Sequence, residues 1–338
     1  LSYCDLASSY SMTCRMPYTL FTVVMNSMFL LLMPLGMLLI GGAANGWAVL
    51  ADLVFYIFFA PQLAFMMERL MYAVNAKMEA AEAVKKLETI LKESPLPEPA
   101  PAGRKNLADS SISFDNVTFT YDGAARPALM NVRFHLPQGA AYALVGPSGG
   151  GKSTIARLIP RFFDVQEGAV LVGGQDVRSI PAAELMEQIS FVFQEVHLFK
   201  KSIRDNIRAA RPNATEEEIL HAAHLAQCGD ILEKIPGGLD AVIGAKGVYL
   251  SGGEMQRIAL ARAILKDAPI VVLDEASSFA DPENEVKIQK AFEALMKGKT
   301  VLMIAHRLST VRRMDRILVV KKGVVVEEGK HDELMEKG

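Results

Sequence analysis

The stretch GPSGGGKST at residues 146–154 decides the fold of this chain. It follows the apolar run AYALV at 141–145, which predicts a buried strand, and a helix is expected from Lys152 onward. The pattern G-x-x-x-x-G-K-S/T between a strand and a helix is typical of a phosphate-binding loop. Its glycines let backbone N–H groups close on phosphates, its lysine reaches the outer phosphates, and its serine hydroxyl binds Mg²⁺. We therefore expect nine residues to hold a nucleotide: Gly146, Pro147, Ser148, Gly149, Gly150, Gly151, Lys152, Ser153 and Thr154.

The run IVVLDE at 270–275 predicts a buried strand that presents two carboxylates at its carboxyl end. Ligands of α/β sheets bind at that edge. We expect Asp274 to hold the Mg²⁺ ion and Glu275 to polarise the attacking water as general base. An apolar strand that ends in acidic residues is weak evidence alone, but the phosphate loop in the same chain makes this one specific. The two motifs together predict hydrolysis of the nucleotide.

The motif LSGGE at 250–254 opens the amphipathic helix EMQRIALARAIL. Ser251 is a good N-cap and Glu254 falls at the third helical position, so one interpretation is an ordinary capping box. The other interpretation is an anion site, because Gly252 and Gly253 expose backbone N–H groups at the positive end of the helix dipole. One nucleotide does not need two phosphate sites in one chain. We therefore expect these four residues to face the nucleotide held by another subunit.

Charge and cysteine content narrow the classes of partner. Lys plus Arg number 36 against 38 Asp plus Glu, so no basic excess indicates binding to nucleic acid. Cys4, Cys14 and Cys228 have no metal-like spacing and an odd count, so no disulfide framework is indicated. The chain begins with Leu1 and shows no signal peptide, and we expect it to be the C-terminal piece of a longer protein.

Residues 17–40 and 47–67 are long and apolar enough to cross a bilayer, which takes about 20 residues. A small polar turn at 41–46 separates them, so they predict a transmembrane helical hairpin. Basic residues flank the two outer ends and are absent from the turn, so both ends should be cytoplasmic. The alternative is a buried core hairpin of a soluble protein. It is disfavoured because residues 16–51 carry no charge, a longer run than cores normally use.

One acidic residue falls within the second predicted span. Asp52 lies near its outer end, about 8 Å along the helix from Trp47. An ionisable residue inside a membrane indicates a transport pathway. The equal alternative is that this side chain simply reaches interfacial water.

The sequence changes character after the second span. Residues 62–92 contain neither Pro nor Gly, so the span should continue as one helix. The stretch PLPEPAP at 95–101 ends that helix and predicts a stiff, extended linker. From about residue 108, strand and helix patterns alternate, which predicts a mostly parallel sheet. We thus expect the C-terminal part of a transmembrane domain at 1–93, a Pro-rich linker at 94–107 and a nucleotide-binding domain at 108–338.

Individual elements of this last domain can also be predicted. Residues 111–121 alternate as an edge strand, and residues 128–136 as its partner. Further strands are expected at 168–172, 189–193, 270–273, 300–304, 316–320 and 323–327. Helices are expected at 203–208, 215–226, 254–267, 282–296 and 331–336.

The chain resembles the ATP-binding cassette (ABC) transporter family, in its exporter-type arrangement of membrane helices followed by one cassette. The resemblance extends over residues 1–338. LSGGE with QRIALARAIL at 256–265 is similar to the family signature, which binds the γ-phosphate of the partner's nucleotide. The implied fold is an α/β P-loop NTPase cassette with a mostly parallel sheet, an antiparallel β subdomain and a helical subdomain. An all-α transmembrane hairpin would precede it.

Four further residues take roles from this resemblance. Tyr121 in FTY matches the aromatic residue that stacks on adenine, and Gln194 in FVFQEVHLF matches the glutamine that contacts Mg²⁺ and the transport helices. His306 in MIAHRLS matches the switch histidine at the γ-phosphate, and Asp281 in SSFADPENE matches the aspartate that crosses the dimer interface. The expected catalytic set is Glu275, His306, Lys152 and Gln194. The expected metal ligands are Ser153, Gln194 and Asp274.

The resemblance also implies how such a cassette works. Two cassettes sandwich two ATP molecules with Mg²⁺, head to tail, and closure drives the membrane helices to alternate access. The partners are a second half-transporter, identical or different, the lipid bilayer and a transported small molecule. The location is the cell (inner or plasma) membrane, with several spans and the cassette on the cytoplasmic side. All residues expected for hydrolysis are present, so this cassette should hydrolyse ATP.

Three positions depart from the commonest exporter pattern. The signature ends in Glu254 instead of Gln, and Phe279-Ala280 stands before Asp281 in place of Ala-Leu. Ala245 replaces a Glu that helps couple the cassette to the membrane domain. The first two departures resemble the subgroup that imports ferric siderophores, which is the first substrate hypothesis. The alternative is lineage drift in an exporter of a lipid, peptide or drug.

Two hypotheses belong to other classes of protein. A soluble ABC-type ATPase of DNA repair or translation lacks membrane spans, so residues 17–67 argue against it. A P-loop kinase or GTPase has no use for the helix that LSGGE opens.

Overall fold

The computed structural model describes most of the C-terminal two thirds of the chain and part of the rest. The described residues are 12, 15–17, 19–20, 23–24, 27, 33–42, 45–92, 94–99, 107–244, 247–274, 282–305 and 308–337. The chain divides into two compact units, Leu1–Pro95 and Leu96–Gly338. Each unit is described by itself.

The first unit is helical. Residues 33–42 form a helix, and α2 (Gly46–Lys92) runs as one helix of 47 residues, which confirms the continuous helix predicted after the second apolar segment. The two helices approach closely at Gly36, where a Cβ atom would lie 2.5 Å from Leu53 Cδ1. Within the described part of the chain, no helix meets the length and apolarity needed to cross a membrane. The two predicted spans are therefore not confirmed.

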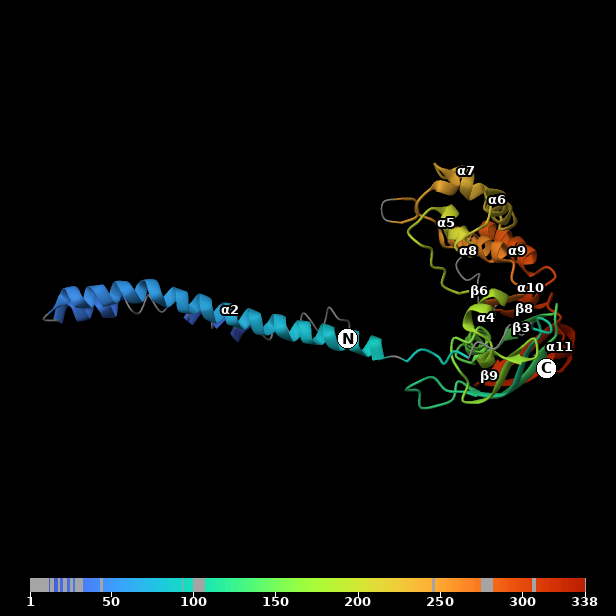
Figure 1. Ribbon diagram of the computed structural model, residues 1–338, viewed down its shortest axis with the longest axis horizontal. Helices are drawn as coiled ribbons and strands as arrows, with labels where there is room; N and C mark the ends of the chain where they lie inside the picture. Colours follow the sequence, from blue (N-terminus) through green and yellow to red (C-terminus); the bar gives the residue numbers. More distant parts are fainter. Residues whose placement is uncertain are drawn as a thin grey trace. The chain divides into compact units, whose positions relative to one another are not determined.

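The second unit is built on a six-stranded sheet (Figure 1). Five of its strands run parallel and β10 pairs antiparallel with β9, as predicted for a mostly parallel sheet. The strands in spatial order are β10 (Val324–Gly329), β9 (Arg316–Lys321), β3 (Ala141–Val145), β8 (Thr300–Ile304), β7 (Ile270–Asp274) and β6 (Ile189–Val192).

A second sheet of four strands is antiparallel. Its order is β2 (Leu129–Leu136), β1 (Ile112–Phe119), β4 (Glu167–Val172) and β5 (Gln175–Asp176). The prediction of an edge strand at 111–121 is wrong, because β1 pairs with β2 on one side and with β4 on the other. Alternation in β1 reports which face meets the core, and it carries no information about a partner strand that follows some 50 residues later in the chain.

Nine α-helices lie in the described part of the second unit, together with 3₁₀ turns at Val177–Ser179 and Gly238–Asp240. They are α3 (Lys152–Leu158), α4 (Ala182–Gln188), α5 (Ile203–Arg208), α6 (Glu216–Leu225), α7 (Gly229–Lys234), α8 (Gly252–Lys266), α9 (Pro282–Met296), α10 (Leu308–Val311) and α11 (His331–Lys337). Helices α5 to α9 gather on one side of this unit (Figure 1). The sequence prediction missed α4, α7 and α10.

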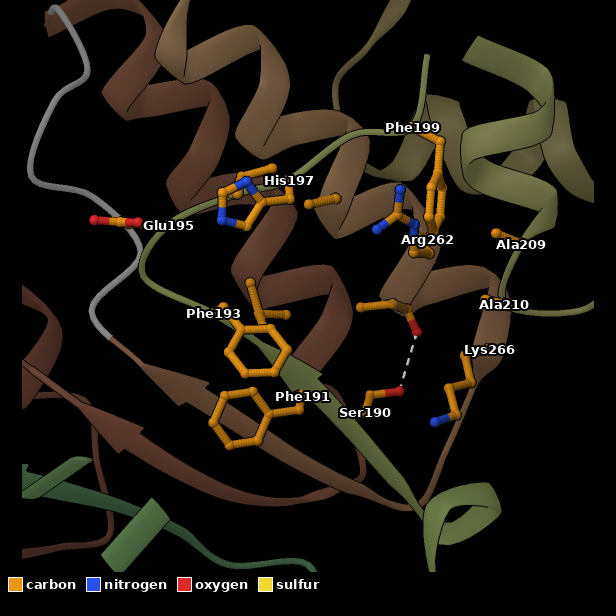
Figure 2. A pocket seen from close by; sticks show the side chains of 14 residues that line it. Ser190, Phe191, Phe193, Glu195, His197, Phe199, Ala209, Ala210, Arg262 and Lys266 are labelled. Atoms are coloured by element: carbon orange, nitrogen blue, oxygen red, sulfur yellow. Dashed lines mark hydrogen bonds between the residues drawn. The ribbon is translucent and has the colours of Figure 1, made fainter. Parts of the chain in front are cut away.

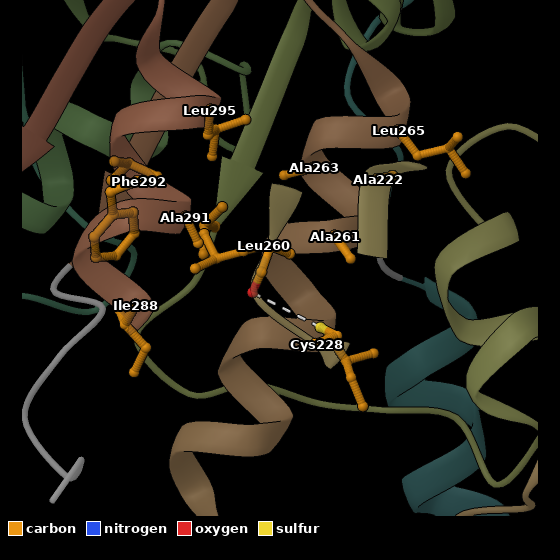
Figure 3. Packing of buried hydrophobic residues seen from close by; sticks show 14 of the residues in the cluster. Ala222, Cys228, Leu260, Ala261, Ala263, Leu265, Ile288, Ala291, Phe292 and Leu295 are labelled. Atoms are coloured by element: carbon orange, nitrogen blue, oxygen red, sulfur yellow. Dashed lines mark hydrogen bonds between the residues drawn. The ribbon is translucent and has the colours of Figure 1, made fainter. Parts of the chain in front are cut away.

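The central strands are buried on both faces, which explains their continuous apolar sequences. In β7, Ile270 and Val272 pack in the cluster between the two sheets, whereas Val271 and Leu273 pack in the cluster below the helices. Figure 3 shows this second cluster, where α8 lies between α9 and the segment around Cys228. The shared sheet therefore joins the helical side rigidly to the phosphate loop.

Candidate functional site

The predicted phosphate loop joins β3 to α3 and is held from outside by the β9–β10 turn. Gly146 and Gly151 have φ angles of 139° and 108°, which L side chains rarely adopt. A Cβ atom at Gly146 would lie 2.0 Å from the carbonyl oxygen of Val320. The amide of Gly323 donates a hydrogen bond of 2.8 Å to the Gly150 carbonyl. Only glycine lets the loop pass this close to a neighbouring strand.

Lys152 is buried at the first position of α3, with 6% of its surface exposed. Its ammonium group donates hydrogen bonds of 2.9 Å to the carbonyl oxygens of Gly146 and Pro147. The cation thus lies within the curve of the loop. This is where a lysine has to be to reach the outer phosphates of a nucleotide.

The two oxygen ligands predicted for Mg²⁺ lie side by side. The Ser153 hydroxyl donates to Asp274 Oδ1 at 3.1 Å, and Asp274 is 3% exposed at the end of β7. A hydroxyl and a carboxylate are the hard oxygen donors that Mg²⁺ prefers. The donor set therefore fits the ion, with the third predicted ligand, Gln194, in the exposed segment after β6.

Parallel strands bring the other predicted residues to the same edge of the sheet. Gly146 follows β3, Asp274 ends β7, and Gln194 comes two residues after β6. Glu275, Asp281 and His306 lie outside the described residues. The neighbour of His306 in the sequence, Ala305, donates its amide to the Leu144 carbonyl at 3.1 Å. Ala305 therefore lies directly beside the strand that enters the phosphate loop.

Tyr121 lies beside the phosphate loop. Its hydroxyl is 3.2 Å from the hydroxyl of Thr154, and its half-buried ring meets the edges of Phe119 and Phe163. The ring centroids are 4.8 and 5.2 Å away. An aromatic ring at this position can contact the base of a nucleotide whose phosphates occupy the loop. Stacking of Tyr121 on adenine stays a prediction.

The LSGGE segment forms a complete capping box at the start of α8. Ser251 Oγ accepts from the Glu254 amide at 3.3 Å, and the Glu254 carboxylate accepts from the Ser251 amide at 2.7 Å. Partial burial acts to raise the pKa of Glu254, but hydrogen bonds from Ser251 and the contact with Lys234 lower it below its usual value. The capping interpretation is therefore correct for the isolated chain. Ser251 and Gly252 nevertheless remain exposed, as an intermolecular anion site requires.

One buried charge near this segment escaped the sequence analysis. Arg257 has a side chain that is 1% exposed and pairs with Asp230 at 2.6 Å. Its second nitrogen donates to Asn284 Oδ1 at 2.9 Å. The available signal was a cation one turn after Glu254 on an otherwise apolar helix face, but its partners cannot be read from the local sequence.

A groove of about 510 Å³ adjoins the Gln194 segment. Phe191, Phe193 and His197 line it on one side and Arg262 and Lys266 of α8 on the other (Figure 2). Both cations are anchored. Arg262 donates to the backbone and side-chain oxygens of Asn206 at 2.8 and 3.0 Å, and Lys266 donates to the carbonyls that end α4 at 2.6 and 2.7 Å. Burial lowers the pKa of Lys266.

Comparisons with known proteins agree with this geometry. Residues 129–278 match the sequence model of a family described as "ABC transporter". The "ATP-dependent lipid A-core flippase" of Sodalis glossinidius is 51% identical over 227 residues, which are 67% of this chain and 39% of the relative. The protein of the same name from Escherichia coli is 50% identical over 230 residues, 68% of this chain and 40% of the relative. The chain thus spans about 40% of the length of these relatives.

A solved structure extends the likeness over nearly the whole chain. "Structure of a bacterial Atm1-family ABC exporter with ATP bound" has a TM-score of 0.69 at 33% identity and covers 99% of this chain and 58% of that one. These relatives do not support the siderophore-importing subgroup suggested by Glu254 and residues 279–281. They favour the alternative of a lipid exporter. Of those positions the structure describes Glu254, which takes part in the capping box of α8.

Proposed function

Because this chain carries an ATP-binding cassette of the ABC transporter family, we propose that it pairs with a second half-transporter and exports a lipid by hydrolysing ATP. The observation that carries the proposal is the common edge of the sheet, where the phosphate loop, Asp274 and the segments leading to Gln194 and His306 meet. The names of the flippase relatives supply the substrate class.

In the proposed reaction the chain's own residues hold and polarise ATP. The loop amides and Lys152 bind its phosphates, and Tyr121 stacks on its base. Ser153, Asp274 and Gln194 would hold Mg²⁺, which supplies positive charge to the phosphates. Glu275 accepts the proton of the attacking water, and His306 contacts the γ-phosphate.

The composite site extends this reaction to the partner subunit. The capping box uses the amides of Ser251 and Glu254, so Gly252 and Gly253 offer theirs at the positive end of α8, while the phosphate loop would hold the chain's own nucleotide. We assign the α8 site to the γ-phosphate of the partner's nucleotide, with Asp281 crossing the interface. If the purified chain hydrolyses ATP without a second kind of subunit, its partner is another copy of this chain.

The proposed link to transport is the groove beside Gln194. It is lined by aromatic rings and by two anchored cations, so it can receive an apolar or acidic segment of the transport helices. Movement of Gln194 on hydrolysis would then pass directly to that segment.

Helix α2 supports placement in a membrane. Its large apolar side chains are exposed, with Trp47 at 82%, Phe58 at 75% and Met66 at 66%. Exposed apolar surface on this scale calls for a cover of lipid or protein. We assign residues 17–40 and 47–67 to the bilayer, with the cassette on the cytoplasmic side.

The test is lipid transport by the intact transporter in proteoliposomes with outward-facing cassettes. Addition of ATP should move a labelled lipid from the outer to the inner leaflet, where it becomes protected from a quencher added outside. The same loss of accessible label without ATP, or no loss with a range of lipids, would contradict lipid export.

A matched variant separates binding from hydrolysis. Glu275→Gln should bind ATP normally, while hydrolysis falls by on the order of a hundredfold or more, the scale of general-base catalysis. Near-normal turnover by this variant, measured as phosphate release, would remove Glu275 from the mechanism.

A further inference from the structure

Arg257 lies in α8 one turn beyond the capping box and is the largest fully buried side chain in the described part of the molecule. Charged groups are rarely buried unless they are paired. Asp230 supplies the pair, with distances of 2.6 Å to Nη1 and 3.1 Å to Nη2. The Gln227 carbonyl accepts a further hydrogen bond from Nη1. The charge of Arg257 is therefore already satisfied on the side of α7.

A further contact connects Arg257 to α9. Nη2 donates to Asn284 Oδ1 at 2.9 Å, and Asn284 lies in the first turn of α9, three residues after Asp281. One guanidinium group thus joins α7, α8 and α9. Its partners Asp230 and Asn284 lie 27 positions before and 27 positions after Arg257 in the sequence. Its planar shape allows this, because it presents several donors in fixed directions.

A second observation places the two helix starts against each other. A Cβ atom at Gly253 would lie 3.0 Å from Cβ of Asn284. The backbone of the phosphate-facing turn of α8 therefore rests on the same residue that Arg257 binds. A side chain at position 253 would press on Asn284, which would have to shift by a few tenths of an ångström.

We infer that Arg257 is a positioning residue that locks the first turn of α8 to the first turn of α9. Residues 251–253 and the first turn of α9 then move as one body toward the partner's nucleotide. This inference rests on the proposed composite site. Neutralising a buried charge needs only Asp230, so the bond to Asn284 is the part that serves position.

Three variants separate positioning from simple burial of a charge. Asn284→Ala removes the acceptor on α9 and leaves the Arg257–Asp230 pair intact. Asn284→Asp keeps an acceptor at the same place and should restore the lock. Lys287→Met is the control, because Lys287 pairs with Asp230 at 2.8 Å from the same helix, and its removal leaves the Arg257–Asn284 bond in place.

Steady-state hydrolysis by the intact transporter gives the first measurement. Asn284→Ala should lower kcat by on the order of tenfold, the factor for one hydrogen bond to a charged group, with KM for ATP nearly unchanged. KM is spared because the phosphate loop makes most contacts with bound ATP. Asn284→Asp and Lys287→Met should turn over like the parent protein. Unchanged kcat in Asn284→Ala, or an equal fall in the control, would overturn the inference.

A mixed dimer tests the direction of the effect. One protomer carries Asn284→Ala, the other is unaltered, and vanadate traps a photoreactive ATP analogue on each. Trapping should fall on the unaltered protomer, whose nucleotide meets the altered α8. Loss on the altered protomer, or equal loss on both, would overturn the inference.

Hydrogen exchange distinguishes failure of the lock from failure of the proposed function. Amides in the first turn of α8 should exchange faster in Asn284→Ala than in Lys287→Met, whether or not the dimer hydrolyses ATP. Equal exchange would remove the lock itself. Faster exchange without composite-site hydrolysis in the parent protein would instead contradict the proposed function.

Discussion

Two helix starts in this molecule, those of α3 and α8, are both predicted to bind phosphate and are built in opposite ways. Helix α3 begins after Gly151, which is left-handed and gives no side-chain cap, and its first turn contains no acidic residue. Helix α8 begins after Ser251, carries a full capping box and has Glu254 in its first turn. One start leaves its amides without a side-chain acceptor, and the other satisfies two of them, those of Ser251 and Glu254, from its own sequence.

The difference shows what each start needs in order to keep its shape. The phosphate loop is shaped by close backbone contacts with Val320 and Gly323 and is ready for an anion without any partner. The α8 turn is shaped by side chains, namely the capping box and the bond from Arg257 to Asn284. A self-capped helix start remains stable while exposed, as the proposed composite site would require of a turn that meets its phosphate only when two cassettes close.

The largest expected effect comes from breaking the backbone contact at the phosphate loop. Gly146→Ala should weaken ATP binding by more than about a hundredfold, because a left-handed residue other than glycine costs about 1–3 kcal/mol and the clash with Val320 adds to it. Gly149→Ala is the matched control, with φ of 73° and no atom within 4 Å of the added Cβ. Its binding should weaken by about tenfold or less. Titration with a fluorescent ATP analogue measures both, and equal losses would show that strain alone governs the loop.

A smaller effect is expected from removing the cap of α8. Ser251→Ala should lower the free energy of unfolding by about 1 kcal/mol, the usual value of an N-cap. It should also lower hydrolysis at the partner's nucleotide by on the order of tenfold or more, since a donor to the phosphate is lost. Thermal unfolding and phosphate release measure the two losses.

The chain offers a second capping box as the control for this variant. Thr215 caps α6 with the same pair of hydrogen bonds. The Glu218 amide donates to the Thr215 hydroxyl at 3.3 Å, and the Thr215 amide donates to the Glu218 carboxylate at 2.8 Å. Thr215→Ala should therefore lose about as much stability as Ser251→Ala and keep full hydrolysis. If both variants lose hydrolysis equally, Ser251 acts only as a cap and the composite site is wrong.

The contrast between the two starts also explains what could be predicted from sequence. The phosphate loop and the strands beside it are contiguous patterns, so residues 141–154 and the strand ending at Asp274 could be assigned directly. Helices α4 and α7 were missed because they are only 7 and 6 residues long and start without a side-chain cap, whereas the equally short α5 begins at the capping residue Ser202. The siderophore hypothesis is not supported by the relatives, and Glu254, on which it rested, takes part in the capping box of α8.

Arg257 marks the limit of sequence reasoning at this site. Its burial depends on Asp230 and Asn284, which lie 27 residues before and after it, and no spacing rule joins these three positions. By local pattern it is an isolated cation on the apolar face of α8. Only the packing of α7 and α9 against that face supplies the partners that make it a buried link.

The smallest expected effect is a difference in acid sensitivity between the two helix starts. Burial acts to raise the pKa of Asp230, but hydrogen bonds from Arg257 and Lys287 outweigh it and lower the pKa to about 2. A lowered pKa in the folded state means that the stabilisation is complete above about pH 4 and is lost as the pH falls toward 2. Because the Asp230 side chain is 44% exposed, solvent screening reduces the contribution to about 1 kcal/mol. The brace of the phosphate loop is a backbone hydrogen bond from Gly323 to Gly150 and does not titrate.

Acid should therefore loosen the α8 start before the α3 start. Hydrogen exchange can be measured between pH 5 and pH 3 and corrected for intrinsic rates. Protection of the amides should fall in the first turn of α8, while the amides in the first turn of α3 should keep their protection. In urea unfolding, Asp230→Asn should be less stable at pH 5, because buried Arg257 loses its counter-charge. Its free energy of unfolding should then fall less between pH 5 and pH 3 than that of the parent protein, by about 0.5 kcal/mol, because a little under half of the Asp230 contribution is lost by pH 3. Parallel pH dependences for the two proteins would show that the α8 start draws no stability from the Asp230 charge, and the contrast would then rest on the capping box alone.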